Sequence, residues 1–122
     1  MGEDDFNEQL RKAFQDLQAQ VFESRERQKN ADVSKNAMKN NIRIANVVKA
    51  QLELIPRNRA VYRSVGRIFI RGSVESEIAR QDEDVKTCTE RIVFFDKQKE
   101  YLEKNVAESE KNLRELVQSR RN

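Results

Sequence analysis

The sequence predicts an all-α protein with a small β element: two long helices pair as an antiparallel coiled coil, and one β-hairpin joins them. Charged residues make up 37% of the 122-residue chain and apolar residues another 37%, which is typical of long helices rather than of a thick globular core. Glycine and proline are scarce, and Pro56, Gly66 and Gly72 all fall near the middle of the chain. We therefore expect one domain, residues 1–122, with a single reversal.

An apolar seam with members three or four positions apart predicts the N-terminal helix over about residues 5–54. Its apolar members are Leu10, Phe14, Leu17, Val21, Ala31, Met38, Ile42, Ala45 and Leu52. Polar residues hold the other seam positions and should pair less tightly, namely Ser24, Gln28, Lys35 and Lys49. Asp4 or Asp5 is expected to cap the start. Pro56 should end the helix because proline cannot continue the hydrogen-bond ladder.

Residues 58–72 form a segment rich in β-branched and aromatic side chains, which Gly66 divides into two short runs. This pattern predicts a β-hairpin with Gly66 at the turn. Ile68 and Ile70 should share one face and Phe69 should lie on the other, because side chains alternate along a strand. A lone two-stranded hairpin is marginally stable in water and exposes two edges. We therefore expect it to pair with hairpins from other copies or relatives of the chain.

A seven-residue repeat predicts the C-terminal helix over about residues 73–120. One seam position holds Ile78, Val85, Ile92, Lys99, Val106 and Leu113, and the other holds Cys88, Phe95, Leu102, Ser109 and Leu116. Ser73 is expected to cap this helix, with Ser76 as the alternative. Neither helix has a stripe wide enough to be buried on all sides, so the two seams should face each other in antiparallel order.

The chain lacks the residues that several classes of function need. It has no histidine and a single cysteine, so histidine-based catalysis, an internal disulfide and a multi-cysteine zinc site are excluded. Cys88 holds a seam position and should be a small buried side chain. The glycine-rich phosphate-binding motifs are also absent. We therefore expect no enzyme activity, no catalytic residue, no metal and no cofactor.

The expected location is the cytoplasm, in soluble form and without a membrane partner. No apolar stretch of the sequence reaches the length of a membrane span. The acidic start, Met-Gly-Glu-Asp-Asp, is unlike a signal peptide.

Five arginines lie close together in the middle of the chain, namely Arg57, Arg59, Arg63, Arg67 and Arg71. One interpretation is that they contact nucleic-acid phosphates. The other is that they guard the exposed edges and outer faces of the hairpin. The net charge of only +3, with acidic residues interleaved elsewhere, favours the second interpretation. We therefore expect no nucleic-acid partner.

Apolar residues near both termini form a candidate binding site, because an antiparallel pair brings the two ends of the chain together. The candidates are Phe6, Leu10, Phe14, Leu113, Leu116 and Val117. They could simply join the last helical turns, which are the least buried part of such a pair. Phe6 and Val117 lie off the seam, however, and should face outward. An exposed apolar tip of this kind would bind unfolded or extended segments without sequence preference.

The segment Val61–Ile70 resembles the Tyr-x-x-Val-Gly-Arg-x-Phe core of the β class of the prefoldin family. Further residues are similar to the same family over essentially the whole chain: Leu10–Phe14, Leu17–Ala19, Lys97–Lys99, Tyr101–Lys104, Asn112–Glu115 and Arg120-Arg121. The resemblance implies a subunit of a hexamer with two α-class and four β-class subunits, whose hairpins assemble into a multi-subunit β-barrel platform. The implied platform residues are Tyr62, Val65, Gly66, Ile68, Phe69 and Ile70, with Gly66 at the turn.

The resemblance also implies an activity and its partners. The coiled-coil tips would bind non-native polypeptides such as actin and tubulin, and would deliver them to the cytosolic chaperonin without ATP. The terminal apolar residues would then be the client-binding tip. The alternative is a generic coiled-coil scaffold or tether without chaperone activity. The apolar hairpin favours the chaperone, because a scaffold needs no such element between its helices.

Overall fold

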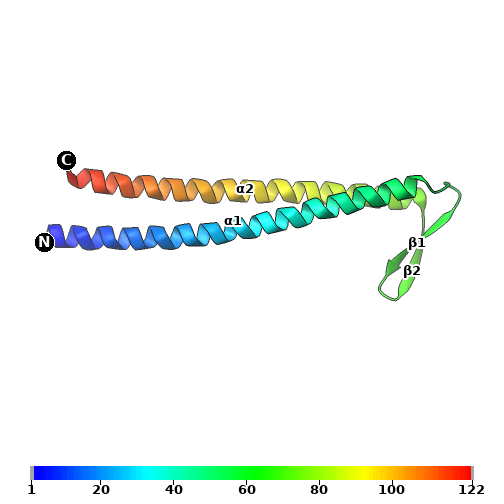
Figure 1. Cartoon of the computed structure of the whole chain (residues 1–122), viewed down its shortest axis with the longest axis horizontal. Helices are drawn as coiled ribbons and strands as arrows, with labels where there is room; N and C mark the ends of the chain where they lie inside the picture. The colour runs from blue at the N-terminus through cyan, green and yellow to red at the C-terminus, as the bar shows by residue number, and fades with distance from the viewer. Residues whose placement is uncertain (1, 122) are drawn as a thin grey trace. The chain divides into compact units, whose positions relative to one another are not determined.

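The computed structural model describes residues 2–121, in which two helices and one two-stranded sheet are present. Helix α1 (Glu3–Glu53) is followed by strands β1 (Ala60–Val65) and β2 (Ile68–Ser73), and helix α2 (Val74–Arg121) follows β2 directly (Figure 1). The predicted fold class, two long helices joined by a β-hairpin, is confirmed. The organisation as a single domain stays a prediction.

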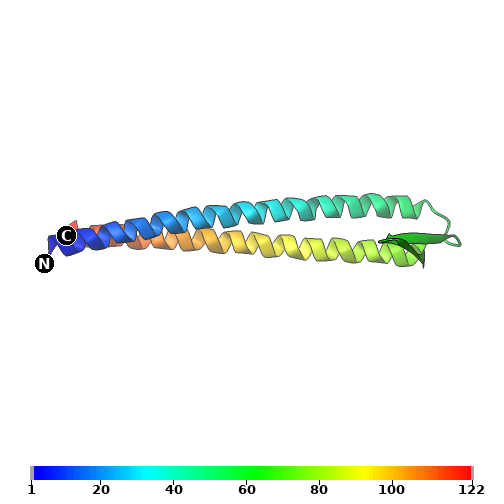
Figure 2. The same ribbon diagram turned by 90° about the horizontal axis from the view of Figure 1, so that it is seen from below.

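Contacts within the chain define two compact units. The terminal unit comprises residues 1–33 and 95–122, of which 2–33 and 95–121 are described, and the hairpin unit comprises residues 34–94. In each unit a stretch of α1 lies beside a stretch of α2 that runs in the opposite direction, as two perpendicular views show (Figures 1 and 2). Both helices therefore contribute to both units, whereas the hairpin belongs to the hairpin unit alone.

The contact between α1 and α2 in the terminal unit follows the predicted seam. Seam residues of this unit are buried or half-buried except Phe14, and Ala31 and Leu102 are the most buried apolar ones. Ser24 is only 4% exposed, and its hydroxyl oxygen accepts a hydrogen bond of 3.1 Å from Gln28 Nε2. The polar seam position thus has the hydrogen bond that a buried hydroxyl requires.

Two polar contacts between the helices fix the antiparallel register of the terminal unit. Gln20 Nε2 donates a hydrogen bond of 3.4 Å to the carbonyl oxygen of Asn105, and Lys99 Nζ lies 2.8 Å from Asp32 Oδ1. The hydrogen bond to Asp32 is the main cause of a raised pKa for Lys99, against a smaller opposing effect of desolvation. Because the pKa is raised, the stability from this pair is present at neutral pH and is lost only as the pH rises through the raised value.

The start of α1 differs from the prediction. The helix begins at Glu3, and the carbonyl oxygen of Gly2 accepts a hydrogen bond of 3.2 Å from the amide of Phe6. The prediction that Asp4 or Asp5 caps the helix is wrong, because the helical ladder already begins at Gly2. Both carboxylates lie in the first turn instead, where negative charge favours the positive end of the helix dipole.

In the hairpin unit the seam continues with small buried side chains. Ala45 and Cys88 are buried and border the same small hollow between α1 and α2, so the prediction of a buried Cys88 is confirmed. Lys49 Nζ forms an ion pair with Asp82 across the two helices. The hydrogen bond to Asp82, together with its negative charge, raises the pKa of Lys49. The antiparallel order predicted for the seams therefore holds in this unit as well.

The β-hairpin has a two-residue turn. Strands β1 and β2 pair antiparallel from Ala60 opposite Ser73 to Val65 opposite Ile68. Gly66, the first turn residue, has a φ of 61°, and no non-glycine residue of the described chain has a positive φ. This is the pattern of a type II′ turn, whose first position favours glycine because a side chain would be strained there. The predicted turn at Gly66 is confirmed.

Strand β2 passes into α2 through a reciprocal cap. The amide of Ser76 donates to Ser73 Oγ at 3.0 Å, and the amide of Ser73 donates to Ser76 Oγ at 3.1 Å. Ser73 therefore caps α2 as predicted, and Ser76 completes the capping box rather than replacing it. A Cβ on Gly72 would lie 3.0 Å from Glu77 Oε1, so the end of β2 closely approaches the first turn of α2.

The chain between α1 and β1 is less regular. The amide of Ile55 donates to the carbonyl oxygen of Leu52 at 3.1 Å, which tightens the last turn before Pro56. Arg59 N then donates to the carbonyl oxygen of Pro56 at 3.0 Å. As predicted, α1 ends before the proline.

Replacing Ser73 by alanine should lower the free energy of unfolding by about 1 kcal/mol, because the amide of Ser76 loses its side-chain acceptor. Urea unfolding followed by circular dichroism measures this change. Ser119→Ala is the matched control, since that hydroxyl only donates to the carbonyl oxygen of Leu116 on the exposed last turns of α2. It should change the stability by less than about 0.5 kcal/mol. Equal effects of the two variants would contradict the capping role.

Lys99→Leu should raise the melting temperature. A leucine at a seam position gains apolar burial, whereas the ion pair that it replaces joins side chains that are partly exposed. Differential scanning calorimetry measures the effect. Lys97→Leu, a change of the same kind at an exposed position on α2, should give no such increase. A fall in the melting temperature for Lys99→Leu alone would show that the ion pair stabilises the seam more than packing would.

Candidate functional site

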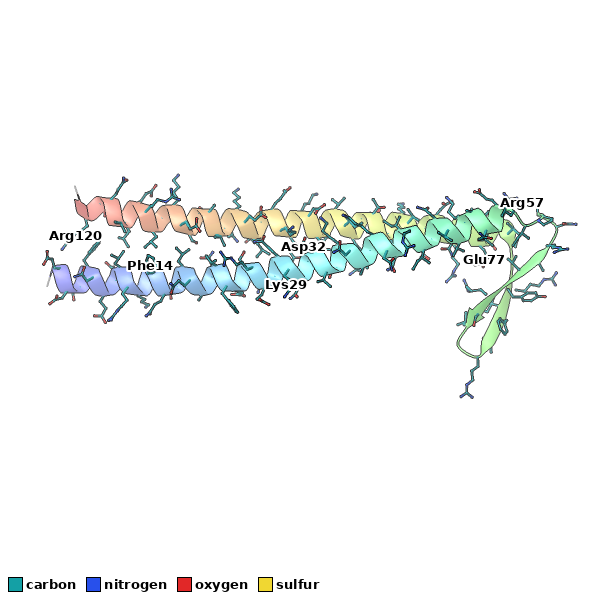
Figure 3. All side chains as sticks on the ribbon, viewed as in Figure 1. Phe14, Lys29, Asp32, Arg57, Glu77 and Arg120 are labelled. Carbon is teal, nitrogen blue, oxygen red and sulfur yellow. The ribbon has the colours of Figure 1, made fainter. Side chains whose placement is uncertain are left out.

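An open groove lies between α1 and α2 in the terminal unit. Its volume is about 770 Å³, and its apolar lining consists of Phe14 and Leu17 from α1 with Leu113 and Val117 from α2. Phe14 is 52% exposed although it holds a seam position, so its ring remains available at the groove. Phe14 lies on the part of α1 that runs toward the chain termini (Figure 3).

The rim of the groove is charged but balanced. It carries two acidic and two basic side chains from α2, together with a glutamine: Glu110, Lys111, Arg114, Glu115 and Gln118. The apolar floor can bury apolar side chains of a ligand. Because the rim carries both signs of charge, it neither attracts nor repels a ligand through net charge. The groove is thus suited to extended apolar segments of varied sequence.

The structure brings together only part of the predicted tip. Phe14, Leu113 and Val117 line the main groove, and Leu116 lines a neighbouring hollow of about 280 Å³. Leu10 is half-buried in the seam. Val117 was expected to face outward and is instead half-buried at the groove, because the groove extends past the seam on α2.

Phe6 also differs from the prediction that it faces outward. Its side chain is half-buried, and the guanidinium of Arg120 lies 4.8 Å from the centre of its ring. This is the geometry of a cation–π contact between the first and last turns of the two helices. Figure 3 shows Arg120 at the end of α2 that lies beside the start of α1. Phe6 therefore helps to join the two helices rather than standing free.

Leu17 belongs to the groove but was not among the predicted tip residues. Its seam position, three residues after Phe14, was the signal that could have included it. The charged rim residues were missed as well, since nothing in the heptad repeat separates them from other solvated charges on α2. Three of the four apolar residues that line the groove, Phe14, Leu113 and Val117, were thus among the predicted tip residues, and their role in binding stays a prediction.

The β-hairpin is the second candidate site. Its register places Val61, Val65, Ile68, Ile70, Arg63 and Gly72 on one face, which we call the Ile68 face. The opposite face, the Phe69 face, holds Ala60, Tyr62, Ser64, Phe69, Arg71 and Ser73. The predicted separation of Ile68 and Ile70 from Phe69 is confirmed.

Large apolar side chains of the hairpin are exposed on both faces. Phe69 is 72% exposed and Tyr62 is 64% exposed on the Phe69 face, while Ile68 is 60% exposed on the other. Leu54, just after α1 in the same unit, is also highly exposed and was not predicted as a site residue. Its off-seam position two residues before Pro56 was the available signal. Exposed apolar surface of this extent is typical of an interaction site.

The described residues show neither a metal site nor a membrane-spanning segment. Across residues 2–121, no three histidine, cysteine, aspartate or glutamate side chains are grouped so that they could hold a metal ion. Over the same part of the chain, neither helix has an apolar stretch long enough to cross a bilayer. Independently of these findings, the groove and the hairpin present apolar side chains with charged residues at their margins.

Comparison with known proteins identifies the family. A family model described as prefoldin subunit matches residues 15–120. A protein named "Probable prefoldin subunit 1" from Caenorhabditis briggsae is 43% identical over 115 residues, which covers 94% of this chain and 98% of that protein. "Prefoldin subunit 1" from Homo sapiens is 32% identical over 113 residues, covering 93% of each chain.

The fold agrees with these relatives. The crystal structure of the prefoldin beta subunit from Thermococcus strain KS-1 matches with a TM-score of 0.61, over 82% of this chain and 90% of that chain, at 17% sequence identity. Two antiparallel helices joined by a β-hairpin are thus the fold that this chain shares with that beta subunit. The chain belongs to the prefoldin family, and as a prefoldin subunit it assembles with other prefoldin subunits. The resemblance carried by Val61–Ile70 is confirmed.

Proposed function

We propose that this chain is one β-class subunit of a hexameric co-chaperone with two α-class and four β-class subunits. It binds non-native polypeptides of the actin and tubulin class at its terminal groove and delivers them to the cytosolic chaperonin. The activity is binding and release in the cytoplasm, without catalysis and without ATP. The groove of the terminal unit carries the proposal, because its apolar floor and balanced rim suit unfolded chains of varied sequence.

The hairpin has the other role in this proposal, which is assembly. Tyr62, Val65, Ile68, Phe69 and Ile70 would join a β-barrel platform, with Gly66 forming the turn. Their exposure in the single chain supports this assignment, since apolar strands with open edges need a partner to be covered. Leu54, in the segment between α1 and β1, is also highly exposed and would extend the covered surface.

A scaffold or tether without chaperone activity is the alternative function. It would keep the same helices but would need neither the apolar hairpin between them nor an apolar groove near the termini. One measurement that separates the two functions is whether the groove residues affect the aggregation of a non-native client.

The double variant Phe14→Ser/Val117→Ser, within the assembled complex, should weaken the suppression of actin aggregation. We expect the complex concentration needed for half-suppression to rise by roughly twofold, because one subunit of the assembly loses two apolar contacts, each worth about 1.5–3 kcal/mol when fully buried. Light scattering of denatured actin after dilution measures this.

Phe22→Ser is the matched control for the groove. Phe22 is an exposed phenylalanine on α1 in the same unit, and it does not line the groove. Its replacement should leave the suppression unchanged. If the groove variant and the control both suppress aggregation as well as the unmodified complex, the client site lies elsewhere and the scaffold function gains support.

Phe69→Asp should release the chain from its companion subunits, because a carboxylate would replace the most exposed apolar ring of the hairpin. Native mass spectrometry of the tagged complex measures the assembly, and circular dichroism checks that the helices remain. Val93→Asp introduces the same charge at a half-exposed apolar position of α2 in the hairpin unit. It should leave the companions bound. An intact complex with Phe69→Asp would refute the platform assignment.

A further inference from the structure

The hairpin region has an unusual charge distribution. Between Glu53 and Glu75 the chain carries five arginines and no acidic residue, although acidic and basic residues are nearly balanced over the whole sequence. Arg63 lies on the Ile68 face and Arg71 on the Phe69 face, so each face of the hairpin carries one guanidinium group. A partner that covers either face is favoured when it supplies negative charge.

Arg63 differs from the other four arginines because it is partly buried. It lies in β1 on the Ile68 face, opposite Ile70 and between Val61 and Val65. Its side chain is half-buried, whereas Arg57, Arg59, Arg67 and Arg71 are exposed. Within the described chain its Nε is hidden from solvent and has no hydrogen-bond partner. A charged donor in this state has lost water without gaining an acceptor.

The chain does not satisfy this donor itself. Glu77 is the acidic residue known to approach the hairpin, since its Oε1 would lie 3.0 Å from a Cβ on Gly72 of the same face. No ion pair between Glu77 and Arg63 is present in residues 2–121. An acceptor from outside the chain would satisfy this Nε, and covering the Ile68 face would make that need greater.

We propose that Arg63 selects the neighbouring subunit in the assembly by requiring a carboxylate from the hairpin that covers the Ile68 face. This inference rests on the proposed role of the hairpin in assembly. The hairpin of a second copy of the chain does not supply this carboxylate, because residues 54–74 contain five arginines and no acidic residue. The charge of this region thus disfavours self-association and favours an acidic relative. A guanidinium is well suited to this role because it binds a carboxylate through two parallel hydrogen bonds.

The test uses the tagged full-length chain, isolated with its companions from its own cells after nuclease treatment. The subunit in contact with the hairpin is identified by cross-linking and mass spectrometry, and its hairpin sequence is inspected for Asp or Glu. Arg63→Glu should lower the recovery of that neighbour by about tenfold or more, because two like charges would meet in a covered site. Changing the neighbour's carboxylate to lysine should then restore assembly with Arg63→Glu.

Two control variants make the result specific. Arg91→Glu introduces the same charge change at an exposed position of α2 in the hairpin unit and should leave recovery unchanged. Glu77→Gln should also leave it unchanged if the acceptor comes from the neighbour. Circular dichroism of each variant confirms that the helices are retained, and the rescue by charge exchange excludes a simple folding defect.

The possible outcomes separate this inference from the proposed function. If the unmodified chain recovers no prefoldin companions, the assembly role and the inference both fail. If companions are recovered but Arg63→Glu keeps them, only the inference fails. It also fails if the neighbouring hairpin has no acidic residue or if Glu77→Gln abolishes assembly. If nuclease treatment alone removes the companions, the inference fails as well, because nucleic acid would then be the bridging partner.

Discussion

A helix that packs against only one other helix can bury only one narrow stripe, and this constraint governs the chain. In the terminal unit the stripe contains small or polar residues as well as leucines, with Ala31 and Ser24 among the most buried positions. The remaining apolar side chains cannot be covered by the chain itself. The exposed strands and the open groove therefore follow from the pairing of two long helices without a third layer to cover them. The hairpin lies outside the stripe, whereas the groove forms where the seam residues Phe14, Leu17 and Leu113 are incompletely covered.

The elements governed by local chemistry could be predicted from the sequence. The seven-residue repeat predicted the seam, Gly66 predicted the turn because few other residues accept its backbone conformation, and Ser73 predicted the start of α2. The start of α1 was predicted less well. Several acidic residues compete there, and the backbone of Gly2 supplies the first acceptor without a side chain.

The candidate site was only partly predictable, because a repeat shows which residues lie on a seam but not how closely the seam is packed. Phe14 holds a seam position and is nevertheless half-exposed, while Val117 lies off the seam and lines the groove. Phe6 contacts Arg120, a residue far away in the sequence. Such outcomes depend on the exact register and spacing of two helices, which a single sequence does not specify.

The junction between β2 and α2 has a mechanical consequence for the hairpin unit. Ser73 is both the last residue of the strand and the cap of the helix, and Val74, the next residue, is fully buried. On the other side, residues 54–59 separate α1 from β1. A displacement of β2 is therefore transmitted to the first turn of α2 without a linker, whereas a displacement of β1 reaches α1 only through residues 54–59. The orientation of the hairpin is thus constrained more closely by α2 than by α1.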